Sequence, residues 1–250
     1  MNKPYLWRKG IDLAMSGATS LSAALAVLAL AAVLGYVAAK GLPALNADLI
    51  LHLPTPVGVS GGGIANAIVG SLVVVGLATA FAVPIGLGAG IYLSEFSDSL
   101  FGDGVRYLAD VLSGVPSIVM GIFAYALIVA RQGHFSALSA AFALGVMMLP
   151  AITRTSEEAL RLVPGSLREG GLALGLPRWR VTACLVLPGA ASGVFTGIVL
   201  AIARVAGETA PLLFTAFGNP FWSIKLTQPI ATLPHTLFNY AISPYDDWHQ

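Results

Sequence analysis

The sequence has few charged side chains, a single cysteine and no phosphate-binding loop. Charged residues make up 10% of its 250 residues, whereas an average soluble domain has about 25%. One cysteine, Cys184, excludes an internal disulfide framework. The four histidines lack metal-ligand spacing, no basic run indicates nucleic acid, and no G-x-x-x-x-G-K-[ST] motif is present. We therefore expect no metal, no cofactor and no nucleic acid, and no ATP hydrolysis by this chain itself.

Hydrophobic residues are abundant instead. They make up 56% of the chain, and the mean hydropathy is +0.82. A membrane-spanning helix needs about 20 predominantly apolar residues, and five segments approach or exceed that length. The sequence therefore predicts an all-α, polytopic transmembrane helical bundle with spans at 17–39, 64–93, 105–130, 135–152 and 184–207.

The first span follows a basic N-terminal stretch with Lys3, Arg8 and Lys9. This arrangement also fits a cleaved signal peptide, but the apolar run is about twice the usual length of a signal core, so a retained helix is favoured. A loop rich in proline and glycine comes next. We expect residues 1–62 to form an N-terminal helix with its loop, and residues 63–250 to form the main membrane domain.

The placement of lysine and arginine predicts the orientation of the spans. With the N-terminus in the cytoplasm, nine of these residues fall in cytoplasmic segments and three in outer segments. The positive-inside rule favours this arrangement. Five spans then place the C-terminus outside.

Proline and glycine interrupt two of the spans. Pro84 and the glycines within 86–90 are expected to kink the second span and to let helices pack closely. Pro116 and Ser117, in "GVPSIV", are expected to bend the third span beside a pore, although a kink made for packing explains Pro116 equally well.

The longest polar stretch runs from residue 153 to 184 and carries five arginines and three glutamates. It contains two S/T-x-x-E patterns that fit helix capping boxes. These are Thr155 with Glu158, and Ser166 with Glu169.

Glycine and proline divide this stretch into short helices. Gly175 can end one helix in a left-handed turn, and Pro177 suits the first turn of the next. The stretch is therefore either a solvated connector or a rigid element that docks on a cytosolic partner.

The same stretch resembles a known motif. Glu169-Gly170-Gly171, then Gly175, then Leu185-x-Leu187-Pro188 is similar in spacing to the EAA loop of ATP-binding-cassette importer permeases, with glycines where that pattern has alanines. The resemblance implies a type I importer permease fold with a coupling helix that contacts a cytosolic ATPase. It assigns this contact to Glu169, Gly170, Gly171 and Gly175. Arg178 could dock on an acidic cleft of the ATPase.

Three other stretches are similar to the PstA family of phosphate-importer permeases. They are Leu112 to Tyr125, Ala203 to Leu213, and Gln228 to Trp248. The resemblance implies a multi-pass permease subunit of the bacterial cytoplasmic (inner) membrane that forms half of a phosphate pathway. Its implied partners are a PstC-like sister permease, a PstB-like ATPase dimer, a PstS-like periplasmic phosphate-binding protein and membrane lipid. The family has a sixth helix after residues 243–248, so we expect a C-terminally truncated gene product.

The stretch "ARVAGETAP" places charge at the end of the last span. Arg204 and Glu208 lie four residues apart, and we expect them on one helical face. They form either a purely structural ion pair or a pore-lining pair, in which Glu208 holds Arg204 poised for phosphate. Thr209 could add a hydroxyl contact, or it could be satisfied locally.

Other functions remain open at this point. A permease for another oxyanion, such as phosphonate, sulphate or molybdate, would share the EAA spacing. A stand-alone channel or secondary carrier would not need it. An intramembrane enzyme would need a catalytic pair such as His–Asp or Ser–Lys within the spans, and none is evident.

Overall fold

The computed structural model describes residues 3–56, 58–59, 61–96 and 99–245. The chain divides into two compact units, Met1–Leu49 and Ile50–Gln250, which are described separately. The described residues form helices and loops, with one isolated bridge between Phe217 and Ile230 as the sole β pairing among them. The prediction of an all-α protein is confirmed.

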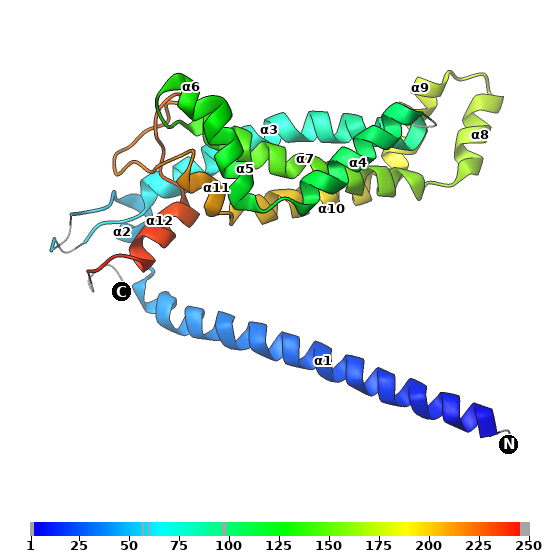
Figure 1. The fold of residues 1–250 in the computed structure, drawn as a ribbon, viewed down its shortest axis with the longest axis horizontal. Coiled ribbons are helices and arrows are strands. Elements are labelled where there is room, and N and C mark those ends of the chain that lie inside the picture. The colour runs from blue at the N-terminus through cyan, green and yellow to red at the C-terminus, as the bar shows by residue number, and fades with distance from the viewer. Residues whose placement is uncertain (1–2, 57, 60, 97–98, 246–250) are drawn as a thin grey trace. The chain divides into compact units, whose positions relative to one another are not determined.

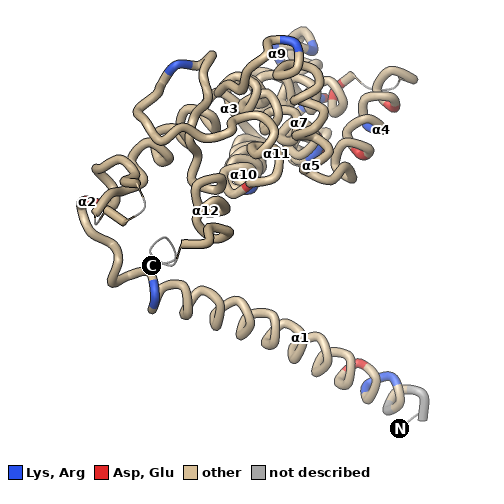
Figure 2. Tube along the Cα trace, turned by 60° about the vertical axis from the view of Figure 1, so that its left-hand side comes forward, with Lys and Arg blue, Asp and Glu red and all other residues tan. Residues whose placement is uncertain are grey.

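The first unit is dominated by α1 (Lys3–Gly41), a helix of 39 residues. Its charged residues lie near its two ends, and the long middle is uncharged (Figure 2). Its middle is long and apolar enough to cross a membrane. The basic stretch predicted to precede the span is itself helical. The short elements η1 (Leu42–Ala44) and α2 (Ala47–Leu51) follow.

The second unit is built on α3 (Ala65–Glu95) and α7 (Ala137–Arg161), which pack along their length (Figure 1). Glycines make this contact possible. A Cβ on Gly86 would lie 2.9 Å from the Ile152 Cβ, and one on Gly90 would lie 2.6 Å from the Ser156 Cβ. The prediction of close helix packing is confirmed at these two positions.

The other glycine and the proline of this stretch behave differently. A Cβ on Gly88 would meet nothing within 4 Å, so Gly88 makes no close helix contact among the described residues of this chain. The helix α3 runs through Pro84 without a break, and Pro84 is exposed.

The third long helix, α10 (Leu187–Ala206), packs against α7. Small residues again allow the approach, because a Cβ on Gly193 would lie 2.9 Å from the Ala159 Cβ and one on Gly197 would collide with Thr155. Such small-residue contacts are typical of helices in membranes. The core between α3, α7 and α10 is apolar, with fully buried side chains that include Val74, Leu144, Met148, Ile152 and Val205.

The predicted third span, 105–130, is two helices rather than one. The helix α4 (Leu100–Gly114) is followed by α5 (Ser117–Ala124), and the chain is bent by 106° between α4 and the helical segment Ser117–Gln132 that α5 begins. The break falls at Val115, whose extended backbone is the conformation that a following proline imposes. Pro116 and Ser117 therefore break this segment, a stronger effect than the predicted bend. A π-helical turn, η2 (Tyr125–Val129), and α6 (Ala130–Gln132) continue α5.

The helix α7 is longer than predicted and includes residues 153–161, which the sequence placed in the polar stretch. The Thr155 capping box is wrong, since the Thr155 hydroxyl donates to the Ala151 carbonyl inside the helix. The second box is also wrong, because α8 (Gly165–Ala173) begins after Pro164 and Ser166 lies within it.

The turn predicted after α8 is present. Gly175 has a φ of 78°, which confirms the left-handed turn. Pro177 precedes α9 (Arg178–Val181) directly instead of lying in its first turn. A π-helical turn, η3 (Thr182–Val186), then joins α9 to α10.

The chain after α10 covers the start of α7. It contains α11 (Ala210–Leu213) and α12 (Leu233–Ala241). The first backbone N–H groups at the start of α7, from Ser136, Ala137 and Leu138, donate to carbonyl oxygens of residues 215, 228 and 226. This segment therefore satisfies donors that a helix start leaves without partners. The end of the PstA-like stretch, residues 246–248, lies outside the described residues.

In the part of the chain that the structure describes, four helices are long and apolar enough to cross a membrane. A fifth span results when the bent pair of α4 and α5, continued to Gln132, is counted as one. The predicted number of spans is reached only in this way.

Candidate functional site

The predicted coupling residues and pathway residues lie at two ends of the second unit. The helices α8 and α9 lie at one end, and α6, α11 and α12 lie at the other (Figure 1). We call these two ends of the second unit the α8 end and the α11 end.

At the α8 end, one face of α8 is exposed and largely apolar. Glu169 and Gly170 are exposed, and nothing lies within 4 Å of a Cβ built on Gly170. Exposed leucines flank them, with exposed fractions of 46% at Leu167 and 83% at Leu174. We call these four residues the α8 surface. An exposed apolar patch of this kind marks a contact with another protein or a membrane.

The opposite side of α8 is held against the chain that follows it. Gly171 is buried, and a Cβ there would lie 2.9 Å from a Val181 methyl and 2.8 Å from a Leu185 methyl. The turn at Gly175 brings the Leu176 N–H to the Gly171 carbonyl at 3.2 Å. The EAA-like residues therefore divide between an exposed face, with Glu169 and Gly170, and a packed face, with Gly171.

Arg168 anchors α8 to the rest of the unit. Its Nη2 donates to the Glu95 carboxylate at 2.7 Å and to the Leu160 carbonyl at 2.8 Å, and its Nη1 donates to the Val163 carbonyl at 2.6 Å. The Arg168 side chain is 23% exposed and that of Glu95 is 10% exposed. The sequence analysis missed this contact.

Beside this contact lies a cavity of about 240 Å³. Arg178, which is exposed, contributes to its wall. The lining residues are Glu95, Phe96, Arg168, Leu172, Arg178, Val181 and Thr182.

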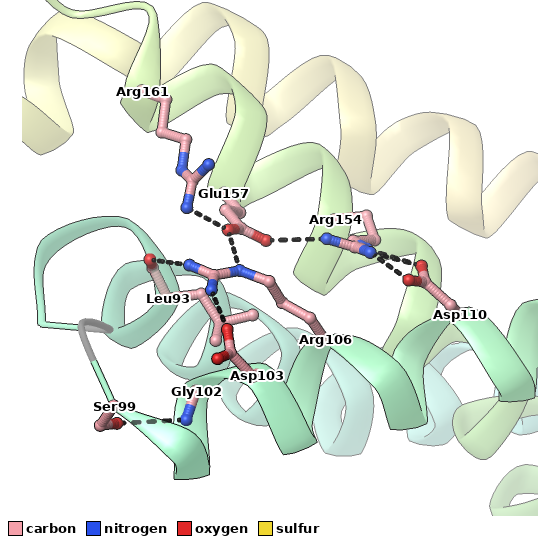
Figure 3. A network of polar contacts seen from close by, with 9 residues as sticks. All are labelled: Leu93, Ser99, Gly102, Asp103, Arg106, Asp110, Arg154, Glu157 and Arg161. Atoms are coloured by element: carbon pink, nitrogen blue, oxygen red, sulfur yellow. Dashed lines mark hydrogen bonds and ion pairs between the residues drawn. The ribbon is translucent and has the colours of Figure 1, made fainter.

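A second charged cluster joins α4 to α7 near the same end (Figure 3). At its centre is Glu157, with a side chain only 3% exposed. Its carboxylate accepts from Arg106 Nε at 2.8 Å, from Arg154 Nη1 at 3.2 Å and from Arg161 Nη2 at 2.8 Å. A buried carboxylate is tolerated when it is neutralised and hydrogen-bonded in this way.

The outer members of this cluster complete its charge balance. Arg106 also donates to Asp103 and to the Leu93 carbonyl, and Arg154 donates through Nε to Asp110 at 2.9 Å. The i−3 and i+4 spacing of arginines around Glu157 could have indicated the contacts within α7. No local signal points to Arg106, which lies 51 residues away in the sequence.

At the α11 end, the predicted helical pair does not form. The helix α10 ends at Ala206, and Gly207 is its C-cap. Glu208 lies beyond the helix, and its N–H donates to the Val205 carbonyl at 3.1 Å. The structure describes both Arg204 and Glu208 and gives no ion pair between them. The i,i+4 geometry is lost because the helix stops two residues too early.

These residues lie between the last turn of α10 and the start of α11. Arg204 is exposed, whereas Glu208 and Thr209 are partly buried. Thr209 is the N-cap residue of α11, and its side chain makes no capping hydrogen bond. The helix α11 packs on α5, since a Cβ on Gly121 would lie 2.6 Å from the Pro211 Cα.

An exposed arginine on an apolar span requires water or another protein around it. A charge at the centre of a membrane helix costs about 2.5–3.5 kcal/mol on insertion scales, and less near the interface. Arg204 lies in the last turn of α10, where the negative end of the helix dipole also favours a cation. Arg204 therefore needs polar surroundings, which the end of a span allows.

The α11 end also contains a cavity of about 620 Å³ that the sequence analysis missed. His235, which is 5% exposed, lines it. Burial lowers the pKa of the His235 imidazole below its usual value, and a hydrogen bond with Asn239 acts in the opposite direction. Asn66 also lines the cavity and donates to the Asn219 carbonyl at 2.6 Å.

The fold and the protruding α8 segment define a class of membrane transport subunit. Residues 82–242 match the family described as "Binding-protein-dependent transport system inner membrane component", and the chain belongs to this family. The fold is also that of solved permeases. It matches a chain of the inward-facing MetNI methionine ABC transporter with a TM-score of 0.61 and 18% identity, covering 74% of this chain and 82% of that chain.

Within this family, the chain groups with permeases named PstA. It is 46% identical over 210 residues to the phosphate transport system permease protein PstA of Yersinia pestis, covering 84% of this chain and 71% of that protein. It is 42% identical over 249 residues to the PstA of Haemophilus influenzae, covering 99% and 88%. A probable PstA of Methanocaldococcus jannaschii is 36% identical over 227 residues, covering 90% and 80%.

Proposed function

We propose that this chain is a membrane-spanning permease subunit of an ATP-driven importer of inorganic phosphate. The observation that carries the proposal is the combination of a bundle of membrane-length helices with an exposed helix at one end, in a chain 42–46% identical to two proteins named as phosphate transport permeases. The alternative of another oxyanion rests only on the shared loop spacing.

The α8 surface is the docking site for a cytosolic ATPase in this proposal. Its leucines supply an apolar contact, and Glu169 supplies an exposed charge. Arg178 adds a cation at the edge of the neighbouring cavity. ATP is hydrolysed by a separate PstB-like dimer, because this sequence has no phosphate loop of its own.

The orientation follows from this assignment. A docking surface for a cytosolic ATPase places the α8 end in the cytoplasm and the α11 end outside. The excess of lysine and arginine in the segments near the α8 end supports the same orientation, with the N-terminus in the cytoplasm. A PstS-like periplasmic phosphate-binding protein would then deliver its ligand at the α11 end.

The pathway residues are Arg204, Glu208 and Thr209. The Arg204 guanidinium offers planar donors that match phosphate oxygens. Glu208 acts on the anion through its charge and not through an ion pair with Arg204, and it keeps phosphate affinity low enough for passage. A PstC-like sister permease would cover this face and form the other half of the path.

Uptake of labelled phosphate tests this proposal. The chain should restore uptake to bacteria that lack their own phosphate-specific permease, when it is produced with its sister permease, ATPase and binding protein. Excess unlabelled phosphate should compete, whereas sulphate, molybdate and phosphonate should not. Competition by one of those anions at lower concentration than phosphate would favour the alternative substrate.

A further inference from the structure

Arg168 is the polar link between α8 and α3 among the described residues. All hydrogen bonds recorded between the two helices come from its guanidinium and end on Glu95, the last residue of α3. Two further bonds reach the Leu160 and Val163 carbonyls, at and just beyond the last turn of α7. One side chain on α8 therefore contacts the ends of both central helices.

The side-chain packing of α8 against the chain that follows it is of a different kind. Gly171 packs against the methyl groups of Val181 and Leu185, which lead into α10. Apolar contacts of this type allow small sliding movements. The Arg168 contacts are directional, and the Glu95 carboxylate is also fixed by the Ser94 hydroxyl at 3.1 Å.

We infer that Arg168 is a positioning residue that passes movement of α8 to α3 and α7, and thereby couples ATP use to opening of the pathway. This inference rests on the proposed function, since it takes α8 to be the element that the ATPase moves. The helices α3 and α7 pack along their length, so a displacement at their α8 end is carried into the bundle as a rigid movement.

The chemistry of the contact requires arginine. The guanidinium holds donors in a fixed fork, and here three of its nitrogens serve a carboxylate and two carbonyl oxygens at once. A lysine ammonium can reach the carboxylate but cannot span all three acceptors in the same geometry. Charge alone therefore should not restore the function.

The experiment uses the complete transporter reconstituted in lipid vesicles, with three readouts. These are recovery of the ATPase on the purified complex, ATP hydrolysis, and phosphate uptake driven by ATP. We expect Arg168→Gln and Arg168→Lys to recover normal amounts of ATPase and to hydrolyse ATP, while uptake per ATP falls about tenfold. Arg131→Gln, an exposed arginine on α6, is the matched control and should leave uptake per ATP unchanged.

A double variant tests whether Arg168 acts through Glu95. Glu95→Gln should lower uptake per ATP in the same direction, and Glu95→Gln with Arg168→Gln should be no worse than Arg168→Gln alone. Loss of the ATPase from both Arg168 variants would assign a docking or folding role instead and overturn the inference. Unchanged uptake per ATP in both variants would also overturn it. Failure of the unmodified transporter to take up phosphate would contradict the proposed function itself.

Discussion

Arg106 on α4 donates Nε to the Glu157 carboxylate on α7 at 2.8 Å, and the Glu157 side chain is 3% exposed. This contact fixes the first half of the bent pair to the central helix. Two arginines of α7, Arg154 and Arg161, also form ion pairs with the Glu157 carboxylate. The α8 end of the unit is thus held by buried charge, whereas its middle is held by glycine and alanine packing.

Removing the central charge should destabilise the protein. Glu157→Gln leaves three guanidiniums without their shared carboxylate, and we expect a loss of about 2 kcal/mol or more in the free energy of unfolding. Denaturant unfolding in detergent measures it. The matched control is Glu158→Gln, because Glu158 is the adjacent exposed carboxylate and should change stability by less than about 0.5 kcal/mol. Equal effects at the two positions would contradict the role of the cluster.

The two glycines Gly90 and Gly88 should respond oppositely to alanine. A Cβ at Gly90 would lie 2.6 Å from the Ser156 Cβ and 2.9 Å from the Thr153 carbonyl, so Gly90→Ala should cost about 1–3 kcal/mol by overpacking. Gly88 faces open space, and Gly88→Ala should be neutral or stabilise the helix by up to about 1 kcal/mol. Thermal unfolding of both variants in detergent checks the pair. A destabilised Gly88→Ala variant would show that α3 has another close neighbour there.

Arg204 should matter for transport and not for stability. Arg204→Lys keeps the charge but loses the planar fork, so phosphate uptake should fall about tenfold. Because Arg204 is exposed, unfolding should be unaffected. Glu208→Gln should also lower uptake, because the pathway would lose a charge that repels phosphate and would therefore hold the anion longer. Normal uptake in both variants would exclude Arg204 and Glu208 from the pathway.

The packing of α12 should weaken in mild acid. The pKa of His235 is lowered in the folded state from 6.5, chiefly by burial. Below this value the unfolded segment binds a proton that the folded segment does not, so stability falls as the pH drops below about 6.5 and is fully present above it. Hydrogen exchange of residues 233–241, corrected for the intrinsic pH dependence, should therefore accelerate between pH 7.5 and pH 5.5 (about one pH unit to either side of 6.5). His235→Asn should remove this dependence, and an unchanged pH profile in that variant would assign the effect to another group.

Local signals in the sequence were enough for some features of this fold. The long apolar runs located the spans, Pro116 located the break between α4 and α5, and Gly175 located the left-handed turn. Each depends on one or a few neighbouring residues. The number of spans could therefore be predicted, provided that α4 and α5 are counted as one bent span.

Contacts between distant parts of the chain could not be predicted in the same way. Arg168 and Glu95 lie 73 residues apart, and nothing in either neighbourhood indicates the other. The predicted helical pair of Arg204 and Glu208 does not form, and the reason is local. The helix α10 ends at its C-cap, Gly207, so Glu208 is not on the same helical face as Arg204. The exposed face of α8 could be anticipated only from the resemblance to the EAA loop.

Phosphate uptake by vesicles tests the central claim most directly. The complete transporter, with this chain, its sister permease, the ATPase and the phosphate-binding protein, should accumulate labelled phosphate only when ATP is present. Omission of the ATPase or of the binding protein should abolish accumulation. Phosphate passage through this chain and its sister permease alone, without ATP, would contradict the account and indicate a channel or a secondary carrier.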